Sequence, residues 1–245
     1  MPDAPFVRRD HRRGIALLTL DSPHNRNALS ARLVTELHEG LDDAVKDPGV
    51  RAILLAHAGG TFCAGADLKD PAAGGPLALA ELLRSIVESP KPVVAEVTGH
   101  VRAGGLGLLA ACDISVAGAG ASFAFTEARI GLAPAVISLP VLPRIDPRAA
   151  ARYYLTGEVF DAAEAIRIGL VSAADDALER ILDGLRSASP QGLAESKRLT
   201  TAEVLHAFDR DTQALAEQSA RLFASPEAAE GMRSFLERRD PSWAL

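Results

Sequence analysis

The chain is poor in cysteine, in aromatic residues and in basic charge, and each shortage argues against a class of protein. Two cysteines, Cys63 and Cys112, are too few for a disulfide framework in 245 residues, which favours a reducing compartment. Aromatic residues make up 4% of the sequence, so the stacking platforms of single-strand nucleic-acid binders are not expected. The net charge of −6 gives nucleic-acid binding little electrostatic support. We therefore expect no nucleic-acid partner.

Long apolar runs and metal-ligand spacings are scarce as well. No run approaches the roughly 20 apolar residues that a membrane span needs, and no continuous apolar signal segment opens the chain. A soluble cytoplasmic protein without a membrane partner is the expectation. The histidines show no metal-ligand spacing with each other or with cysteine, so no metal site is expected. A basic run, Arg8 to Arg13, is expected to be a solvated N-terminal arm.

The hydrophobic share of 48% is ample for one well-buried core. Strand 15–20, helix 31–46 and strand 50–57 follow one another, with Ser30 as a helix N-cap, which predicts a right-handed parallel crossover. The last third of the chain reads as helix only, over 175–187, 190–200, 202–223 and 226–238. The order of elements predicts an α/β fold followed by a helical C-terminal region.

The stretch 91–132 organises the chain. Gly104, Gly105 and Gly107 come after a buried strand and before a short apolar helix predicted at 108–111. Glycines at this point let the backbone approach a ligand, and the first amides of the helix lack partners and suit an oxyanion. A single carboxylate, Glu127, follows without neighbouring acids. Backbone donors plus one carboxylate are sufficient for chemistry beside a carbonyl.

Five segments in order resemble the crotonase family, also called the enoyl-CoA hydratase/isomerase superfamily. The segments are 25–29, 61–69, 91–114, 125–134 and 155–171. The details of 104–108 and 126–138 are similar to bacterial hydratases of the methylglutaconyl-CoA type. The resemblance implies a ββα spiral core, residues 1–187, and a helical region, residues 188–245, that builds homotrimers or hexamers. It also implies an acyl-CoA thioester as substrate and no separate cofactor, since CoA is part of the substrate.

In such enzymes two backbone N–H groups hold the thioester oxygen, and the matching motifs place them at Ala66 and Gly104. Glu127 matches a catalytic glutamate that transfers protons. A pairing of Glu127 with Arg129 or Arg144 on the surface is the alternative for that residue. The resemblance also implies a set of residues that line the path of CoA and the acyl chain, namely Ala64, Asp67, Leu68, Lys69, Gly105 and Gly107. For Lys69 an exposed helix-end lysine is equally consistent with the sequence.

One departure from the family pattern bears on the reaction. Hydratases of this family commonly use two glutamates, and Gly107 occupies the position of the first. The nearby Asp113 is expected to make a structural hydrogen bond, and Tyr153 and Tyr154 are expected to be packing residues. We expect the space at Gly107 to hold a water or a substrate carboxylate, which favours hydration of a 2-enoyl-CoA. An enoyl-CoA isomerase and a non-catalytic acyl-CoA-binding protein are the alternatives.

Overall fold

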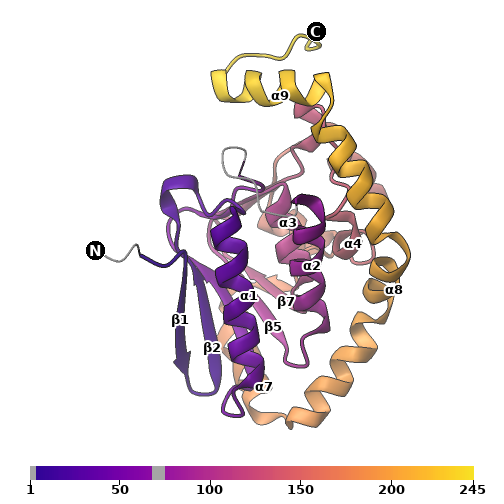
Figure 1. Ribbon diagram of the computed structural model, residues 1–245. Coiled ribbons are helices and arrows are strands. Elements are labelled where there is room, and N and C mark those ends of the chain that lie inside the picture. The colour runs from indigo at the N-terminus through magenta and orange to yellow at the C-terminus, as the bar shows by residue number, and fades with distance from the viewer. Residues whose placement is uncertain (1–3, 68–74) are drawn as a thin grey trace.

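The chain is built on two mixed sheets, in a computed structural model that describes residues 4–67 and 75–245 (Figure 1). The larger sheet has the strand order β1-β2-β3-β5-β7-β10. Its strands are β1 (Val7–Arg12), β2 (Ile15–Leu20), β3 (Ala52–His57), β5 (Val93–Val97), β7 (Ile114–Ala117) and β10 (Ala173–Ala174). β1 pairs antiparallel with β2, and the other neighbours pair in parallel. The predicted α/β class is confirmed.

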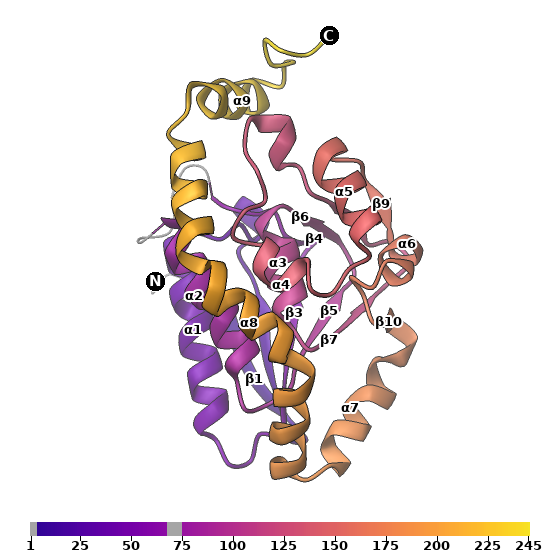
Figure 2. The same ribbon diagram turned by 90° about the vertical axis from the view of Figure 1, so that its right-hand side faces the viewer.

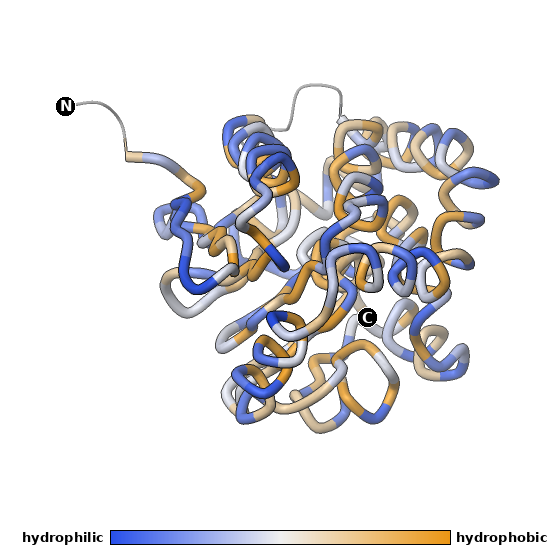
Figure 3. Tube along the Cα trace, turned by 90° about the horizontal axis from the view of Figure 1, so that it is seen from below, coloured by the Kyte–Doolittle hydropathy of each residue, from blue (hydrophilic) through white to orange (hydrophobic). Residues whose placement is uncertain are grey.

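Helices cover both faces of the larger sheet and form the C-terminal part of the chain. They are α1 (Ala31–Lys46), α2 (Gly75–Glu88), α3 (Gly104–Ala111), α4 (Ser138–Val141), α5 (Pro147–Thr156), α6 (Ala162–Arg167), α7 (Leu178–Ser187), α8 (Pro190–Phe223) and α9 (Pro226–Glu237). α1 and α2 pack on one face of the sheet, whereas α7 packs on the other through Leu182 (Figure 2). The central strands β3 and β5 are buried along most of their length, as expected for parallel strands covered on both faces. Figure 3 shows the hydropathy of each residue along the trace.

The smaller sheet has the order β4-β6-β8-β9 and is made of very short strands. They are β4 (Thr61–Cys63), β6 (His100–Arg102), β8 (Ser122–Ala124) and β9 (Phe160–Asp161). β4, β6 and β8 pair in parallel, and β9 closes the sheet antiparallel to β8. No sequence pattern indicated this sheet, because strands of two or three residues carry too few side chains to show alternation.

Several sequence predictions are confirmed by the structure. The strand at 15–20 and the helix at 31–46 have the predicted bounds, and the Ser30 side chain accepts a hydrogen bond from the Leu33 amide at 3.3 Å. Each of these elements has a clear apolar pattern and a local start signal. These two signals predict from the sequence where the element begins and ends.

Three sequence predictions are wrong. The basic N-terminal run is an edge strand rather than an arm: Arg8 pairs with Asp21 at 2.6 Å and Arg9 with Glu39 at 2.8 Å. The predicted helices 190–200 and 202–223 form one 34-residue helix, α8, and the Thr201 hydroxyl inside it donates to the Lys197 carbonyl at 2.8 Å. The short apolar helix begins at Gly104, four residues before the predicted start at 108, so the glycine cluster is helical.

Candidate active site

The three residues expected to carry the chemistry follow the carboxyl ends of three adjacent parallel strands. Ala66 comes three residues after β4, Gly104 two residues after β6, and Glu127 three residues after β8. The carboxyl ends of parallel strands meet at one edge of a sheet, where ligands bind in open α/β sheets. The Ala103 amide donates to the Ala124 carbonyl at 3.2 Å, which ties the last two segments together. Glu127 opens a short 3₁₀-helix, η2 (Glu127–Ile130).

The segment of Ala66 lies against the start of α3. Gly65, at φ +93°, lies next to the first residue of α3. A Cβ added to Gly65 would be 3.3 Å from the Gly104 nitrogen. In turn, the Ala66 nitrogen lies 3.6 Å from where a Cβ on Gly104 would stand. The Leu29 amide holds the segment by donating to the Gly65 carbonyl at 2.8 Å. Two amides from distant parts of the sequence are thereby brought side by side, because glycine at both points allows the close approach.

Both amides lack an acceptor within the described part of the chain. Gly104 is the first residue of α3, and the first amides of an α-helix have no partner inside it. Ala103 turns the chain into the helix at φ +46°, a conformation that a non-glycine residue rarely adopts. Ala66 is exposed, and its amide has no hydrogen-bond acceptor among residues 4–67 and 75–245. The pair is therefore open to an oxygen of a bound molecule.

The Glu127 side chain is buried, with 8% of the residue exposed. Its Oε2 atom has no hydrogen-bond partner in the described residues, and no ion pair there reaches Arg129 or Arg144. The surface pairing considered from the sequence is therefore wrong, since Arg129 instead donates to the Thr156 carbonyl at 3.1 Å. Burial raises the pKa of Glu127 to about 7. A carboxyl group with this pKa can both accept and return a proton near neutral pH.

Helix α9 packs directly on η2, as Figure 1 shows at the C-terminal end of the molecule. A Cβ on Gly131, at φ +74°, would be 2.8 Å from the Glu227 carbonyl carbon, and a Cβ on Gly231 would overlap the Ile130 carbonyl. Two glycines thus allow the backbones of α9 and η2 to touch. The C-terminal helix fixes the short turn that presents Glu127.

The space expected at Gly107 is filled by protein. The Ile137 Cγ2 methyl lies 2.5 Å, and the Leu83 Cδ1 methyl 3.2 Å, from where a Cβ on Gly107 would stand. The prediction that this place holds a water or a substrate carboxylate is wrong, because the side chain of Ile137 occupies it. Sequence reasoning could not find this, since Ile137 is 30 residues away along the chain.

The residues expected to line the path of CoA have different surroundings. Gly105 packs on β4, where a Cβ on it would be 2.8 Å from the Cys63 Cβ. Asp67 accepts a hydrogen bond from the Asn25 Nδ2 at 2.9 Å, which links two of the family-like segments. Ala64 is half-buried beside them. Leu68 and Lys69 lie outside the described residues.

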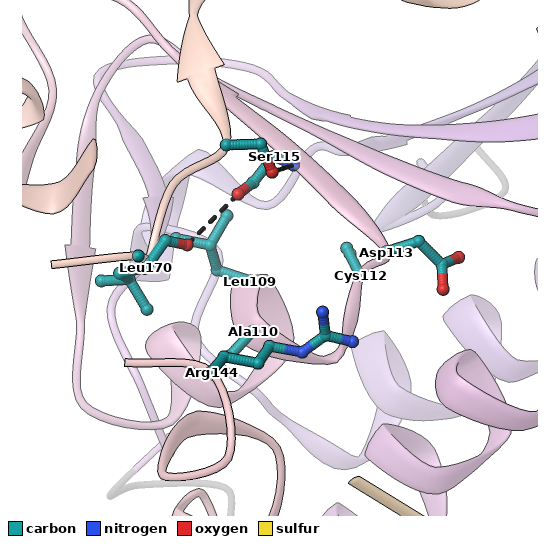
Figure 4. Close-up of a pocket in the computed structure, with 9 residues that line it drawn as sticks. Leu109, Ala110, Cys112, Asp113, Ser115, Arg144 and Leu170 are labelled. Carbon is teal, nitrogen blue, oxygen red and sulfur yellow. Dashed lines mark hydrogen bonds between the residues drawn. The ribbon is translucent and has the colours of Figure 1, made fainter. Parts of the chain in front are cut away.

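A cavity of about 170 Å³ lies at the far end of α3, away from Gly104 (Figure 4). Asp113 and Arg144 line it. The Asp113 Oδ2 accepts from the Val93 amide at 2.7 Å and from the Lys197 Nζ at 2.8 Å, which confirms the structural role expected for Asp113. Ala66, Gly104 and Glu127 do not line this cavity.

No three His, Cys, Asp or Glu side chains in residues 4–67 and 75–245 converge so that they could hold a metal ion. Within the same ranges no helix is both long and apolar enough to cross a bilayer.

Known proteins are similar to this chain over nearly its whole length. The sequence model of the enoyl-CoA hydratase/isomerase family matches residues 10–244. The crystal structure of an enoyl-CoA hydratase from Mycobacterium avium superposes with a TM-score of 0.91 at 54% identity, covering 99% of this chain and 100% of that one. Enoyl-CoA hydratase EchA19 of Mycobacterium tuberculosis is 34% identical, over 99% of this chain and 96% of its own.

The chain belongs to the enoyl-CoA hydratase/isomerase family and has the α/β crotonase fold. Mouse mitochondrial methylglutaconyl-CoA hydratase is also similar, with 30% identity over 96% of this chain and 81% of its own. It is one of several hydratases with comparable similarity, so the methylglutaconyl-like segments do not single out an acyl group. Membership of the family implies an acyl-CoA substrate.

Proposed function

We propose that this protein hydrates a 2-enoyl-CoA thioester, with Glu127 as its single acid and base. The observation that carries the proposal is that three groups follow the carboxyl ends of β4, β6 and β8. They are two amides and one buried carboxyl oxygen, Oε2, none of which has a hydrogen-bond partner in the described part of the chain. The names of the relatives, which are hydratases, support addition of water as the reaction.

In the proposed mechanism the Ala66 and Gly104 amides hold the thioester oxygen. Glu127 removes a proton from water while the water oxygen bonds to C3, and the thioester oxygen takes on enolate charge. The two amides stabilise that charge more strongly than the neutral carbonyl, which lowers the barrier. Glu127 then returns the proton to C2, so one carboxyl performs both transfers.

A second candidate reaction is the shift of a double bond from C3 to C2, with Glu127 removing a proton from C2 and delivering it to C4. The filled space at Gly107 favours it, since Ile137 and Leu83 put methyl groups where hydratases of the family commonly have a second acid. This reaction needs no water. A third candidate, a non-catalytic acyl-CoA-binding protein, predicts affinity for CoA thioesters without turnover.

A product assay separates the three candidates. Purified protein is incubated in ¹⁸O-labelled water with straight, branched and carboxylated 2-enoyl-CoA and 3-enoyl-CoA thioesters, and the products are identified by mass spectrometry. Hydration adds one labelled oxygen to a 2-enoyl-CoA, whereas isomerisation converts a 3-enoyl-CoA without adding oxygen. Binding without either product would refute the enzymatic proposal. The panel also identifies the preferred acyl group.

We also propose that residues 188–245 form a helical region through which the chain builds a homotrimer or hexamer. Large apolar side chains are exposed there, among them Leu199 at 82%, Phe235 at 57% and Leu236 at 56%. Exposed apolar side chains on neighbouring elements are typical of contact surfaces between subunits. Light scattering coupled to size-exclusion chromatography tests this, and a monomer at micromolar concentration would contradict it.

A further inference from the structure

Tyr154, on α5, lies against the segment that carries Glu127. Its ring centroid is 4.6 Å from that of Phe125, two residues before Glu127, and the two planes are tilted by 51°. Phe125 is fully buried, so it holds the phenol ring in one place. The neighbouring Tyr153 points elsewhere: its hydroxyl donates to the Glu164 Oε1 at 2.7 Å.

The Tyr154 hydroxyl has hydrogen-bonding capacity left over. The Ser138 Oγ lies 3.5 Å from it, but the same Ser138 hydroxyl donates to the Pro134 carbonyl at 2.7 Å. A serine has one proton, and the shorter bond takes it. The Tyr154 proton can therefore point to the Ser138 Oγ, and its oxygen lone pairs have no other donor among residues 4–67 and 75–245.

This hydroxyl contacts Ser138, which neighbours the residue that fills the place of the missing acid, while its ring packs on Phe125 of the Glu127 segment. Ser138 directly follows Ile137, whose methyl group fills the space at Gly107. Burial, and to a smaller extent the Glu127 charge, raise the pKa of Tyr154 above its usual value. The phenol is therefore neutral at physiological pH and sits within electrostatic reach of Glu127.

We propose that Tyr154 is a second catalytic residue, which holds the attacking water between its own hydroxyl oxygen and the Glu127 carboxylate. This inference rests on the proposed hydration. One water O–H points to the Glu127 Oε2 and the other to the Tyr154 oxygen, which leaves a water lone pair to attack C3. The new bond joins that oxygen to C3, Glu127 takes the proton and returns it to C2, and Tyr154 keeps its own proton throughout. The phenol thereby replaces the acid absent at Gly107.

The test compares two reactions in one set of variants. Tyr154→Phe keeps the ring on Phe125 and removes the hydroxyl, and Tyr153→Phe on the same helix is the matched control. Hydration is followed by uptake of ¹⁸O into a 2-enoyl-CoA. Proton transfer without water attack is followed by entry of solvent deuterium into a 3-enoyl-CoA.

We expect Tyr154→Phe to slow hydration about 30-fold, as for loss of one hydrogen bond to a reacting group, and to change deuterium entry less than about 2-fold. Ser138→Ala removes the hydrogen-bond partner of the Tyr154 hydroxyl. It should slow hydration several-fold and again change deuterium entry much less. Equal loss of both reactions would mean a structural role, and unchanged hydration would mean no role; either overturns the inference. If the wild-type protein forms no hydrated product, the proposed function itself fails, and that outcome is seen before any variant is made.

Discussion

The Ile137 Cγ2 methyl lies 2.5 Å from the place where a Cβ on Gly107 would stand. Helix α3 and the segment before α4 therefore fit together because position 107 has no side chain. Positions 107 and 137 are matched in volume. Position 107 therefore has no acidic side chain, and the Ile137 side chain fills the space that one would need. This relationship decides what the site can hold beside its single carboxyl.

Gly107→Ala should overpack this contact and lower the free energy of unfolding by about 1–3 kcal/mol. Ile137→Ala should leave a cavity and cost about 2–4 kcal/mol. The double variant should cost less than the sum, because the new methyl group fills part of the cavity. Urea unfolding measures all three, and strict additivity would show that the two side chains do not share space. Gly184→Ala is the control, since nothing lies within 4 Å of a Cβ there and a stabilising effect is expected.

Glu127→Gln should lower kcat for a 2-enoyl-CoA by about 10²–10⁴-fold, because the amide can neither accept nor return the proton. In the wild type, Glu127 is protonated below its pKa of about 7 and cannot act as base. The kcat/KM for hydration should therefore rise with pH and level off above about 7. A flat profile between pH 5 and 8, or wild-type-like turnover by the variant, would contradict the role of this residue.

The same substitution should change stability in a pH-dependent way. Burial raises the pKa of Glu127 from its ordinary 4.5 to about 7, so folding favours the protonated form. The stability from this group is present below the unfolded pKa and is lost as pH rises through about 7. A shift of this size corresponds to about 3 kcal/mol. Glu127→Gln should then be more stable than the wild type at pH 8 and similar to it at pH 4.5, as thermal unfolding at the two pH values can show.

Replacing Gly104 by proline removes the amide at the first position of α3. Proline is tolerated at the first helical position, which Gly104 occupies in α3. Gly104→Pro should reduce kcat by about 10²–10³-fold, as for loss of one oxyanion donor. Gly104→Ala is the matched control, because it adds the same Cβ, 3.1 Å from the Leu29 Cδ1, but keeps the N–H. Equal losses in both variants, with circular dichroism unchanged, would show that crowding rather than the amide matters.

The Asp113–Lys197 pair should stabilise the fold and have no part in catalysis. The Lys197 Nζ bonds to Asp113 and also donates to the Ile86 carbonyl at 2.8 Å, and its side chain is 4% exposed. Lys197→Met should cost about 3–5 kcal/mol, because it leaves a buried carboxylate without its partner. The double variant with Asp113→Asn should recover part of that loss. Turnover per folded molecule should be unchanged in both, and a selective loss of kcat would contradict the structural role.

Sequence alone singled out Glu127 and the two amide segments that the structure brings to one edge of the smaller sheet, because each lies in a run of residues with few alternatives. It missed Ile137, Ser138 and Tyr154, which lie in ordinary proline-containing or helical segments. Nothing local distinguishes Tyr154 from Tyr153, although one phenol faces the Glu127 segment and the other binds Glu164. Successive residues on a helix point about 100° apart, and only the packing of α5 shows which of the two faces the site.

The amino-acid order by itself determined the α/β class, the bounds of elements with strong apolar periods, and the family to which the chain belongs. Those properties depend on local spacing, which the sequence displays directly. Tertiary structure alone decided that Glu127 is buried with no ion pair to any described residue, that Ile137 fills the space at Gly107, and that the Tyr154 ring packs on Phe125. Each of these depends on contacts between residues far apart in the chain, which close packing sets and no local pattern records.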